Sequence, residues 1–261
     1  MPEGDTVHRV AARLRTVLEG RLVLHADLAR ARGPGRIARG DRVRTVRAVG
    51  KHLEIEFERG SVLRTHLGMG GSWRVYRAGM PWGRPAHRAA VALTVPGWTV
   101  VCFDTRRVEL GRVTDRHLAQ LGPDLCADDD ATLVTAAVQR LARFADASTT
   151  IGEALLDQRI AAGIGNIHRS EILFRAGLDP ATPVADLDAE TRRAVYEVAR
   201  RSLTQAVAGG RTRPAVYGRA GRPCRRCGTT IRVRRLGEGA RAVWWCPTCQ
   251  PPVGARSAPS T

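Results

Sequence analysis

The pattern of hydrophobic and polar positions changes about halfway along the chain. Residues 3–18 carry apolar side chains at helical spacing, with Asp5 or Thr6 as the expected N-cap, and Gly20 follows the end of this helix. From residue 21 to about 114, short β-type runs alternate with Gly and Pro clusters, which predicts a sandwich or barrel of strands. We expect these strands at 42–49, 52–58, 61–66, 72–76, 89–95 and 99–104.

The second half of the chain has a helical pattern. It begins after the segment LGPDLCADDD, which contains Gly, Pro and a cluster of acidic residues. Helices are expected at about 131–145, 150–159, 166–176 and 188–208. Residues 210–223 are rich in Arg, Gly and Pro and are predicted to form a connecting loop. We predict an N-terminal domain at 1–121, a linker at 122–130, a helical domain at 131–214, a cysteine module at 215–250 and a disordered tail at 251–261.

Charge and composition narrow the class of protein. The chain has 42 Lys+Arg against 25 Asp+Glu, a net charge of +17, which favours a polyanionic partner such as nucleic acid. Hydrophobic residues make up 43% of the chain, as in globular proteins and unlike disordered ones. No apolar run approaches the roughly 20 residues that span a bilayer, and the N-terminus does not resemble a signal peptide. We therefore expect a soluble intracellular protein with no membrane partner.

Two residue types occur once each, Lys51 and Asn166. Because arginine supplies the positive charge elsewhere, a retained lysine indicates a position that needs an amine able to lose its proton. Gly163 and Gly165 allow a tight turn with positive φ just before Asn166, which would then lie at a helix N-terminus. Backbone N–H groups there favour a phosphate, although an ordinary asparagine N-cap is the alternative.

Four of the six cysteines form two CxxC pairs, and Cys102 and Cys126 lie apart from them. This spacing predicts one structural Zn²⁺ held by four thiolates, with no open position for catalysis. The ligands would be Cys224, Cys227, Cys246 and Cys249. The same segment carries eight arginines and one acid between residues 219 and 250, so it suits contact with phosphates. A ribbon that only braces the fold is the alternative.

The N-terminus offers a possible nucleophile. If Met1 is removed, Pro2 presents a secondary α-amine, and α-amino groups have a pKa of about 8. Attack of this amine on a sugar aldehyde carbon gives a cationic iminium that acts as an electron sink for elimination. Glu3 is adjacent and could move protons. On these residues alone, an ordinary start of a chain is the simpler interpretation.

Together, these motifs resemble the formamidopyrimidine-DNA glycosylase / endonuclease VIII family of base-excision repair enzymes. The resemblance runs from residue 1 to about 250 and includes MPEGDTVHRVAARL, GKHL, HLGMGGSW, DTRRV, LLDQRIAAGIGNIHRSEIL and WWCPTCQ. It implies an α+β, multi-domain fold: an N-terminal β-sandwich with a leading helix, a helix-two-turn-helix domain and a zinc-stapled β-hairpin. The start of the chain looks most like the endonuclease VIII branch.

The resemblance also implies roles for individual residues. Pro2 would attack C1′ of the damaged nucleotide, Glu3 would donate or shuttle protons, and Lys51 would donate a proton in β-elimination. Arg241 would bind a phosphate and take part in δ-elimination. DNA contacts would come from Met69 as a wedge and from His87, Arg106, Arg107 and Asn166. The base must leave the duplex for this chemistry, at a cost of a few kcal/mol. His52 and His66 are interpreted as structural.

Three positions depart from the family pattern. Thr6 stands where better-known branches have glutamate, so a carboxylate near the amine is missing. Val108 replaces the phenylalanine wedge of the formamidopyrimidine branch, which argues against a dedicated 8-oxoguanine enzyme. The Gln-Leu-Tyr wedge of typical endonuclease VIII is also absent, and Leu67-Gly68-Met69 looks more like the other branch. These departures indicate a divergent endonuclease VIII-like subgroup.

The leading hypothesis is a bifunctional DNA glycosylase and AP lyase. It would remove oxidised bases, pyrimidines in particular, through a Pro2 Schiff base followed by β,δ-elimination. Its expected partner is damaged DNA, duplex or single-stranded, and we expect a monomer located in the cytoplasm at the bacterial nucleoid. Two alternatives are a damaged-DNA-binding protein that has lost catalysis, motivated by Thr6 and Val108, and a zinc ribbon that binds RNA.

Overall fold

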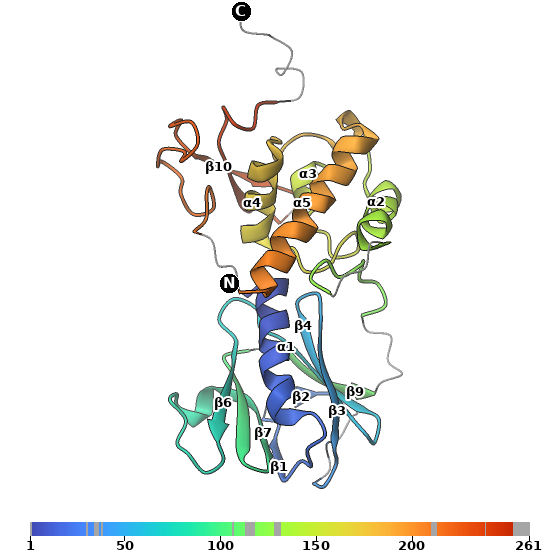
Figure 1. Ribbon diagram of the computed structural model, residues 1–261, viewed down its shortest axis with the longest axis vertical. Helices are drawn as coiled ribbons and strands as arrows, with labels where there is room; N and C mark the ends of the chain where they lie inside the picture. The colour runs from blue at the N-terminus through green and yellow to red at the C-terminus, as the bar shows by residue number, and fades with distance from the viewer. Residues whose placement is uncertain are drawn as a thin grey trace, which may run out of the picture. The chain divides into compact units, whose positions relative to one another are not determined.

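The computed structural model divides the chain into two compact units, residues 1–119 and 120–261 (Figure 1). The structure describes residues 2–29, 31–33, 37, 39–105, 107–112, 118–127, 132–209, 213–237 and 239–252. The predicted mixture of α and β structure is confirmed, with a β-sandwich in the first unit and helices with a β-hairpin in the second. No helix within the described residues is long and apolar enough to cross a membrane.

Two sheets form the first unit. A five-stranded sheet has the order β2-β9-β5-β4-β3, and a four-stranded sheet has the order β1-β7-β8-β6. The first comprises β2 (Ala31–Arg32), β9 (Arg107–Arg112), β5 (Ser61–His66), β4 (His52–Phe57) and β3 (Val43–Val49). The second comprises β1 (His25–Asp27), β7 (Ala89–Val95), β8 (Trp98–Phe103) and β6 (Ser72–Arg77). Alternate strand residues of both sheets and one face of α1 share a single hydrophobic core.

Helix α1 (Gly4–Leu18) begins before the position that the expected N-caps imply. Its N-cap is Glu3, whose backbone is extended and whose carbonyl oxygen accepts the Val7 N–H at 3.1 Å. The predicted N-caps are therefore wrong. Asp5 lies inside the first turn, where a carboxylate is favoured by the helix dipole, and pairs with Arg9 at 2.8 Å instead of capping.

Helix α1 runs antiparallel to β3 (Figure 1). The backbone N–H of Gly20, just beyond the helix, donates to Val43 O at 2.9 Å, and the Arg15 guanidinium, one turn earlier, donates to Val46 O at 3.0 Å. Moving toward the N-terminus of α1 therefore means moving forward along β3. This direction points the start of the chain at the turn between β3 and β4, which contains Lys51.

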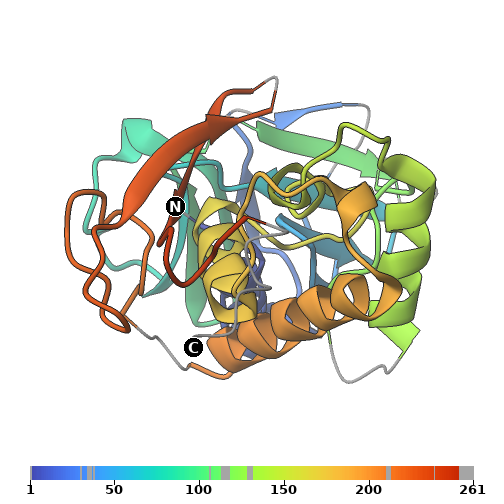
Figure 2. The ribbon, with the colours of Figure 1, turned by 90° about the horizontal axis from the view of Figure 1, so that it is seen from above.

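The second unit consists of helices, a short 3-10 helix and a β-hairpin. The elements are α2 (Thr132–Phe144), α3 (Ile151–Ala154), α4 (Asn166–Ala176), η2 (Val184–Asp186), α5 (Ala189–Val207), β10 (Arg232–Leu236) and β11 (Arg241–Trp245). Seen from above, α4 lies between α5 and the hairpin (Figure 2). Helix α4 therefore contacts both the helical core and the cysteine-bearing module.

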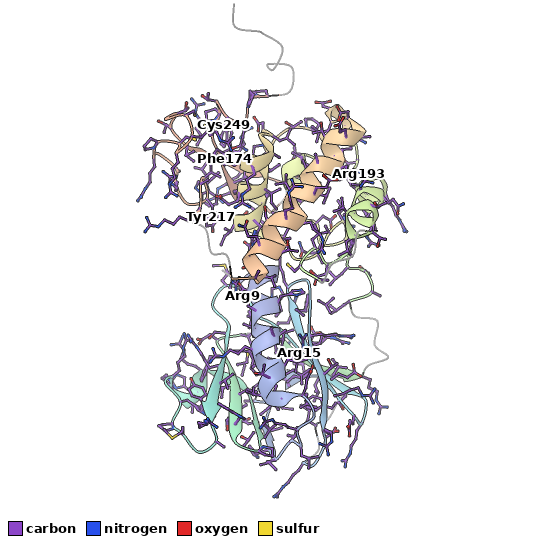
Figure 3. All side chains as sticks on the ribbon, viewed as in Figure 1. Arg9, Arg15, Phe174, Arg193, Tyr217 and Cys249 are labelled. Atoms are coloured by element: carbon purple, nitrogen blue, oxygen red, sulfur yellow. The ribbon has the colours of Figure 1, made fainter. Side chains whose placement is uncertain are left out.

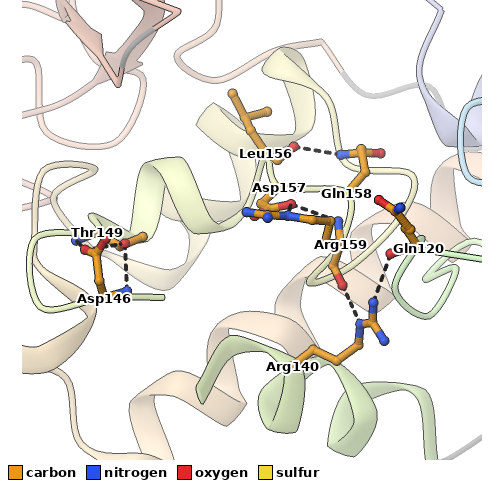
Figure 4. A network of polar contacts seen from close by, with 8 residues as sticks. All are labelled: Gln120, Arg140, Asp146, Thr149, Leu156, Asp157, Gln158 and Arg159. Carbon is orange, nitrogen blue, oxygen red and sulfur yellow. Dashed lines mark hydrogen bonds and ion pairs between the residues drawn. The ribbon is translucent and has the colours of Figure 1, made fainter. Parts of the chain in front are cut away.

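The helix expected at 150–159 is much shorter in the structure, because α3 ends at Ala154. Side chains fix the turns that follow it (Figure 4). The Asp157 carboxylate accepts the Arg159 N–H at 2.9 Å, and the Gln158 amide donates to Leu156 O at 2.9 Å and to Ile164 O at 3.0 Å. These local bonds compete with continuation of the helix.

The turn before α4 follows the sequence prediction in part. Gly163 has φ +100°, which confirms the left-handed backbone expected there. Gly165 is instead the N-cap of α4, with an extended backbone at φ −117°, so the prediction of a positive φ is wrong for this residue. Asn166 is consequently the first helical residue and does not cap the helix.

Candidate functional site

Basic side chains collect at one end of the five-stranded sheet. Lys51 lies in the turn before β4, and the strand register places His52 opposite His66 and His66 opposite Arg107. The rings of His52 and His66 meet edge to face with centroids 5.0 Å apart. Burial is the main cause that lowers the pKa of His66, and the positive charges of Arg107 and Lys51 lower it further. Three strands thus contribute to one cationic end of the sheet.

His66 holds the start of the loop that carries Met69, which agrees with its interpretation as structural. Its pKa is lowered mainly by burial and further by Arg107 and Lys51, so the ring is neutral at pH 7. The neutral ring accepts the Gly68 N–H at Nδ1, at 3.2 Å, and its backbone oxygen accepts the Thr105 hydroxyl at 2.7 Å.

The N-terminal residues reach the same end of this unit. From Arg15 back to Glu3, α1 rises about 18 Å. From Val46, which Arg15 contacts, forward to Lys51 the chain advances about 16 Å. Because helix and strand are antiparallel, Glu3 and Lys51 lie at a similar level. Glu3 is only 1% exposed and Pro2 is half-buried, so the predicted nucleophile and its neighbouring carboxylate are sheltered from water.

Asp5, beside the departure at Thr6, is engaged within α1. Asp5 is buried in the first turn of α1 and pairs with Arg9. The Thr6 hydroxyl lies 3.5 Å from Asp5 Oδ1, and Arg9 also donates to the Thr6 oxygen at 3.3 Å. Position 6 thus offers a hydroxyl that belongs to this polar group, and the effect of the departure on activity stays a prediction.

The loop after β5 presents Met69 to solvent. Met69 is 83% exposed, whereas the neighbouring Leu67 is buried in the sandwich core. The loop is closed by Gly71 N–H donating to Leu67 O at 2.8 Å, and a Cβ on Gly71 would lie 2.4 Å from that oxygen. Gly68 has φ +59°. The two glycines therefore permit a tight loop with an apolar side chain at its tip, as a wedge requires.

Val108 does not take part in such a loop. It is 2% exposed, belongs to the sandwich core and pairs with Thr65 in the strand register. His87 lies exposed on the short helix η1 (Ala86–Arg88), and Arg107 is exposed at the start of β9. Arg106 lies outside the described residues. Of the predicted DNA contacts in this unit, Met69, His87 and Arg107 are thus accessible.

In the second unit, Asn166 and Arg241 belong to one polar cluster. Asn166 Nδ2 donates to Ala242 O at 2.9 Å, directly after Arg241. Arg169 completes the cluster by donating to Asn166 Oδ1 at 2.5 Å and to Ala242 O at 2.7 Å. Arg169 is 0% exposed, so a buried guanidinium joins helix α4 to strand β11. Sequence reasoning did not single out Arg169, because arginine is abundant along the whole chain.

The side chain of Asn166 is therefore engaged with the hairpin, and Arg241 is the exposed member of the cluster. Arg241 also borders a cleft of about 630 Å³. Its wall contains basic and acidic side chains, which include Arg159, Arg169, Glu153, Asp157 and Asp146. Asp157 and Arg159 pair within this wall at 2.6 Å (Figure 4). The phosphate-binding role of Asn166 stays a prediction.

The four predicted cysteines form one cluster with all sulfur atoms within 4.8 Å of each other. A tetrahedron of thiolates around Zn²⁺ at about 2.3 Å has edges of about 3.8 Å. The Sγ–Sγ distances of 3.9 Å for Cys224–Cys249 and 3.4 Å for both Cys227–Cys246 and Cys227–Cys249 fit this geometry. Hydrogen bonds from Thr229 lower the pKa of the Cys227 thiol to about 6, whereas burial raises the pKa of Cys246 and Cys249, so without a metal the cluster favours one thiolate, at Cys227. The cluster can hold a metal ion.

Neighbouring groups hold this module in place, and Phe174 of helix α4 packs against it near Cys249 (Figure 3). The Glu171 carboxylate accepts three backbone N–H groups of the incoming chain, from Ala215, Val216 and Tyr217, at 2.8–3.0 Å. Gln250 receives the Cys246 N–H at 3.0 Å and donates to Leu178 O at 2.7 Å. The cysteine module is thus attached to helix α4 and the loop that follows it.

Comparisons with known proteins agree with this arrangement. Residues 1–111 match the formamidopyrimidine-DNA glycosylase N-terminal domain, and residues 121–215 match the formamidopyrimidine-DNA glycosylase H2TH domain. The two matches cover most of the chain. The chain therefore belongs to the formamidopyrimidine-DNA glycosylase family, which confirms the resemblance drawn from its motifs.

Within that family, similar proteins include members of the endonuclease VIII branch. The chain is 39% identical to the DNA-(apurinic or apyrimidinic site) lyase Nei2 of Mycolicibacterium smegmatis, covering 96% of this chain and 99% of the other. It is also 39% identical to endonuclease 8 2 of Mycobacterium bovis, over 96% and 100% of the two chains. The crystal structure of MutM (Fpg) from Thermus thermophilus is 32% identical, with a TM-score of 0.79, over 95% and 98%.

Proposed function

We propose that this protein is a bifunctional DNA glycosylase and AP lyase that removes oxidised bases, pyrimidines in particular, and cleaves the strand at the resulting site. The observations that carry this proposal are the antiparallel contacts of α1 with β3, from which Glu3 and Lys51 are inferred to lie at a similar level of the first unit, and the burial of Glu3 beside Pro2. The endonuclease VIII-type relatives support the reaction class. Damaged DNA is the proposed partner.

In the proposed reaction, the Pro2 nitrogen attacks C1′ with its lone pair, and the base leaves with the electrons of the glycosidic bond. The attached nitrogen then loses its proton, the C1′–O4′ bond breaks with a proton going to O4′, and the nitrogen lone pair forms the C1′=N⁺ iminium, which makes the C2′ proton acidic. Loss of this proton breaks the C3′–O bond, and a second elimination breaks the C5′–O bond. Glu3 is proposed to carry protons to the departing base and the opening sugar, and Lys51 to donate a proton during β-elimination.

DNA binding is proposed to involve both units. Met69 would fill the space left by the extruded nucleotide, which has to leave the stack for reaction at C1′. His87, Arg106 and Arg107 would contact the DNA from the first unit. Asn166 and Arg241 would contact a phosphate from the second, and Arg241 would also assist δ-elimination. Exposed arginines and the helix N-terminus have the chemistry that phosphates require.

The metal in the cysteine cluster is proposed to be one structural Zn²⁺. Four thiolate ligands leave no open position, so the ion would stabilise the hairpin that carries Arg241. The proposed domains are a catalytic sandwich at 1–121, a linker at 122–130, a helix-two-turn-helix domain at 131–214 and a zinc hairpin at 215–250. We propose a monomer that works at the nucleoid in the bacterial cytoplasm.

A panel of labelled oligonucleotides tests this function. We expect cleavage at thymine glycol and at abasic sites, with a product that carries phosphate at both ends of the gap. Pro2→Gly should bind the same DNA without cleaving it at the wild-type rate. Binding without any cleavage by the wild-type protein, together with an intact mass that includes Met1, would instead identify a damaged-DNA-binding protein without catalysis.

A further inference from the structure

The segment between β6 and β7, residues 78–88, folds over the outer face of the four-stranded sheet. Beneath it lies a small cluster separate from the main core, formed by Ala92, Val101 and Phe103, against which Trp82 packs. The Trp82 and Phe103 rings are 6.0 Å apart at 80°, an edge-to-face contact. Because the rings are nearly perpendicular, Phe103 does not stack flat on the indole of Trp82.

A shallow cavity of about 420 Å³, widely open to solvent, lies beside this indole. Its lining consists of Met80, Pro81, Trp82, Arg84 and Ala86. Met80 is 58% exposed, so its side chain is accessible to a ligand at this cavity. The cavity therefore combines apolar atoms, one aromatic ring and one guanidinium, which is the combination that a nucleobase with its phosphate can use.

Two arginines and one acid lie at this cavity. Asp104 binds the two arginines that flank His87, with Oδ2 at 2.6 Å from Arg84 and Oδ1 at 2.6 Å from Arg88. Two guanidinium groups on one carboxylate leave a net positive charge, which favours a phosphate, and Asp104 fixes both groups in position.

The backbone supports the same arrangement. Asp104 has φ +60°, a conformation that costs energy in any residue other than glycine. Its N–H donates to Arg88 O at 3.1 Å while its carboxylate holds the side chain of the same arginine. The short helix with His87 is therefore held against the turn that leads to Arg107.

We propose that this surface, formed by Met80, Trp82, Arg84 and Arg88, binds an unpaired nucleotide of the DNA, with its base on the indole of Trp82 and its phosphate near the two guanidinium groups. The proposal rests on the proposed function and deepens it by naming the substrate class. Single-stranded and forked DNA offer unstacked bases, whereas intact duplex does not. The protein should therefore act on lesions in unpaired regions with the help of this surface.

The test compares Trp82→Leu with wild type in binding assays on three probes of equal length. These are a single-stranded oligonucleotide with bases, a strand of abasic residues only, and a duplex with one abasic site. Leucine keeps the apolar contact with Phe103 but has no π-face. Trp98→Leu is the matched control, because Trp98 belongs to the same sheet and also has an arginine over its ring, at 4.1 Å.

We expect Trp82→Leu to weaken binding of the base-containing single strand by about 5- to 150-fold, as for loss of one base–aromatic stack. Binding of the abasic strand and of the duplex should change less than about twofold, and Trp82→Phe should restore binding of the single strand. Equal losses on all three probes, no loss on any, or the same loss in Trp98→Leu would overturn the proposal.

The proposed function can fail separately from this inference, because strand cleavage by the wild-type protein reports on catalysis alone. A polyglutamate peptide provides a further comparison. If it displaces the single strand as well as unlabelled DNA does at equal charge, the surface recognises acidic chains in general and the assignment to a nucleotide is wrong.

Discussion

Replacement of the buried Arg169 should separate the hairpin from helix α4. Its guanidinium donates to Asn166 Oδ1 at 2.5 Å, to Ala242 O at 2.7 Å and to Arg241 O at 3.3 Å. A hydrogen bond that involves a charged group contributes about 1.5–3 kcal/mol, and buried acceptors left without a partner add a desolvation cost. Because losses within one cluster are not additive, we expect Arg169→Met to lower the free energy of unfolding by about 3–5 kcal/mol.

Urea denaturation followed by circular dichroism measures this loss. Arg159→Met is the matched control in the same unit. Its guanidinium pairs with Asp157 at 2.6 Å, but Arg159 is 54% exposed, so its loss should cost less than about 1 kcal/mol. Arg169→Met should also weaken DNA binding, because Arg241 loses its support. A loss below about 1 kcal/mol for Arg169→Met, or equal losses for the two variants, would refute the assignment of Arg169 as the brace.

Three further variants and a chelation experiment test other parts of the structure. Val108→Phe should lower stability by about 1–3 kcal/mol in a urea titration, because Val108 is buried in the core; an unchanged midpoint with tighter duplex binding would mean that it can act as a wedge. Met69→Ala should leave the unfolding midpoint unchanged and slow excision from duplex DNA, whereas an unchanged excision rate contradicts the wedge role. For His66, the folded pKa lies below the unfolded value of 6.5, so its contribution to stability is complete above pH 6.5 and is lost as the pH falls through 6.5 toward the folded pKa. The free energy of unfolding of the wild type should therefore fall as the pH is lowered from about 7 to about 5, and His66→Gln should make this fall smaller. An identical pH dependence in the two proteins contradicts the burial of a neutral ring. A chelator should release about one equivalent of zinc per chain from the wild-type protein and abolish DNA binding through Arg241. Cys227→Ser should lose the same binding. Full binding without metal contradicts the structural role of zinc.

Much of the fold followed from the sequence because its signals were local. Short β-type runs between Gly and Pro clusters predicted β4, β5 and β7 closely, within one residue of their observed bounds. The short edge strands β1 and β2 were missed because two or three residues carry no pattern, and the six-residue strand β9 was missed as well. The helix at 150–159 was predicted too long because Asp157 and Gln158 fix turns through side-chain bonds that a hydrophobic pattern does not record.

Some residues of the candidate site could likewise be predicted from the sequence, and others could not. The cysteine pairs stood out by spacing and Lys51 by rarity, Met69 was implied by the family resemblance, and the structure brings the four cysteines together and exposes Met69. Arg169 did not stand out, because its role depends on burial against residues distant in sequence. Such roles require the three-dimensional arrangement.

The central claim is that the Pro2 amine forms the covalent intermediate. Trapping with borohydride on an abasic-site duplex, followed by peptide mass spectrometry, tests it most directly. We predict one DNA adduct on the N-terminal peptide, attached to Pro2 after removal of Met1, and retained in Lys51→Ala. An adduct on Lys51, or equal trapping by Pro2→Gly, would contradict the account.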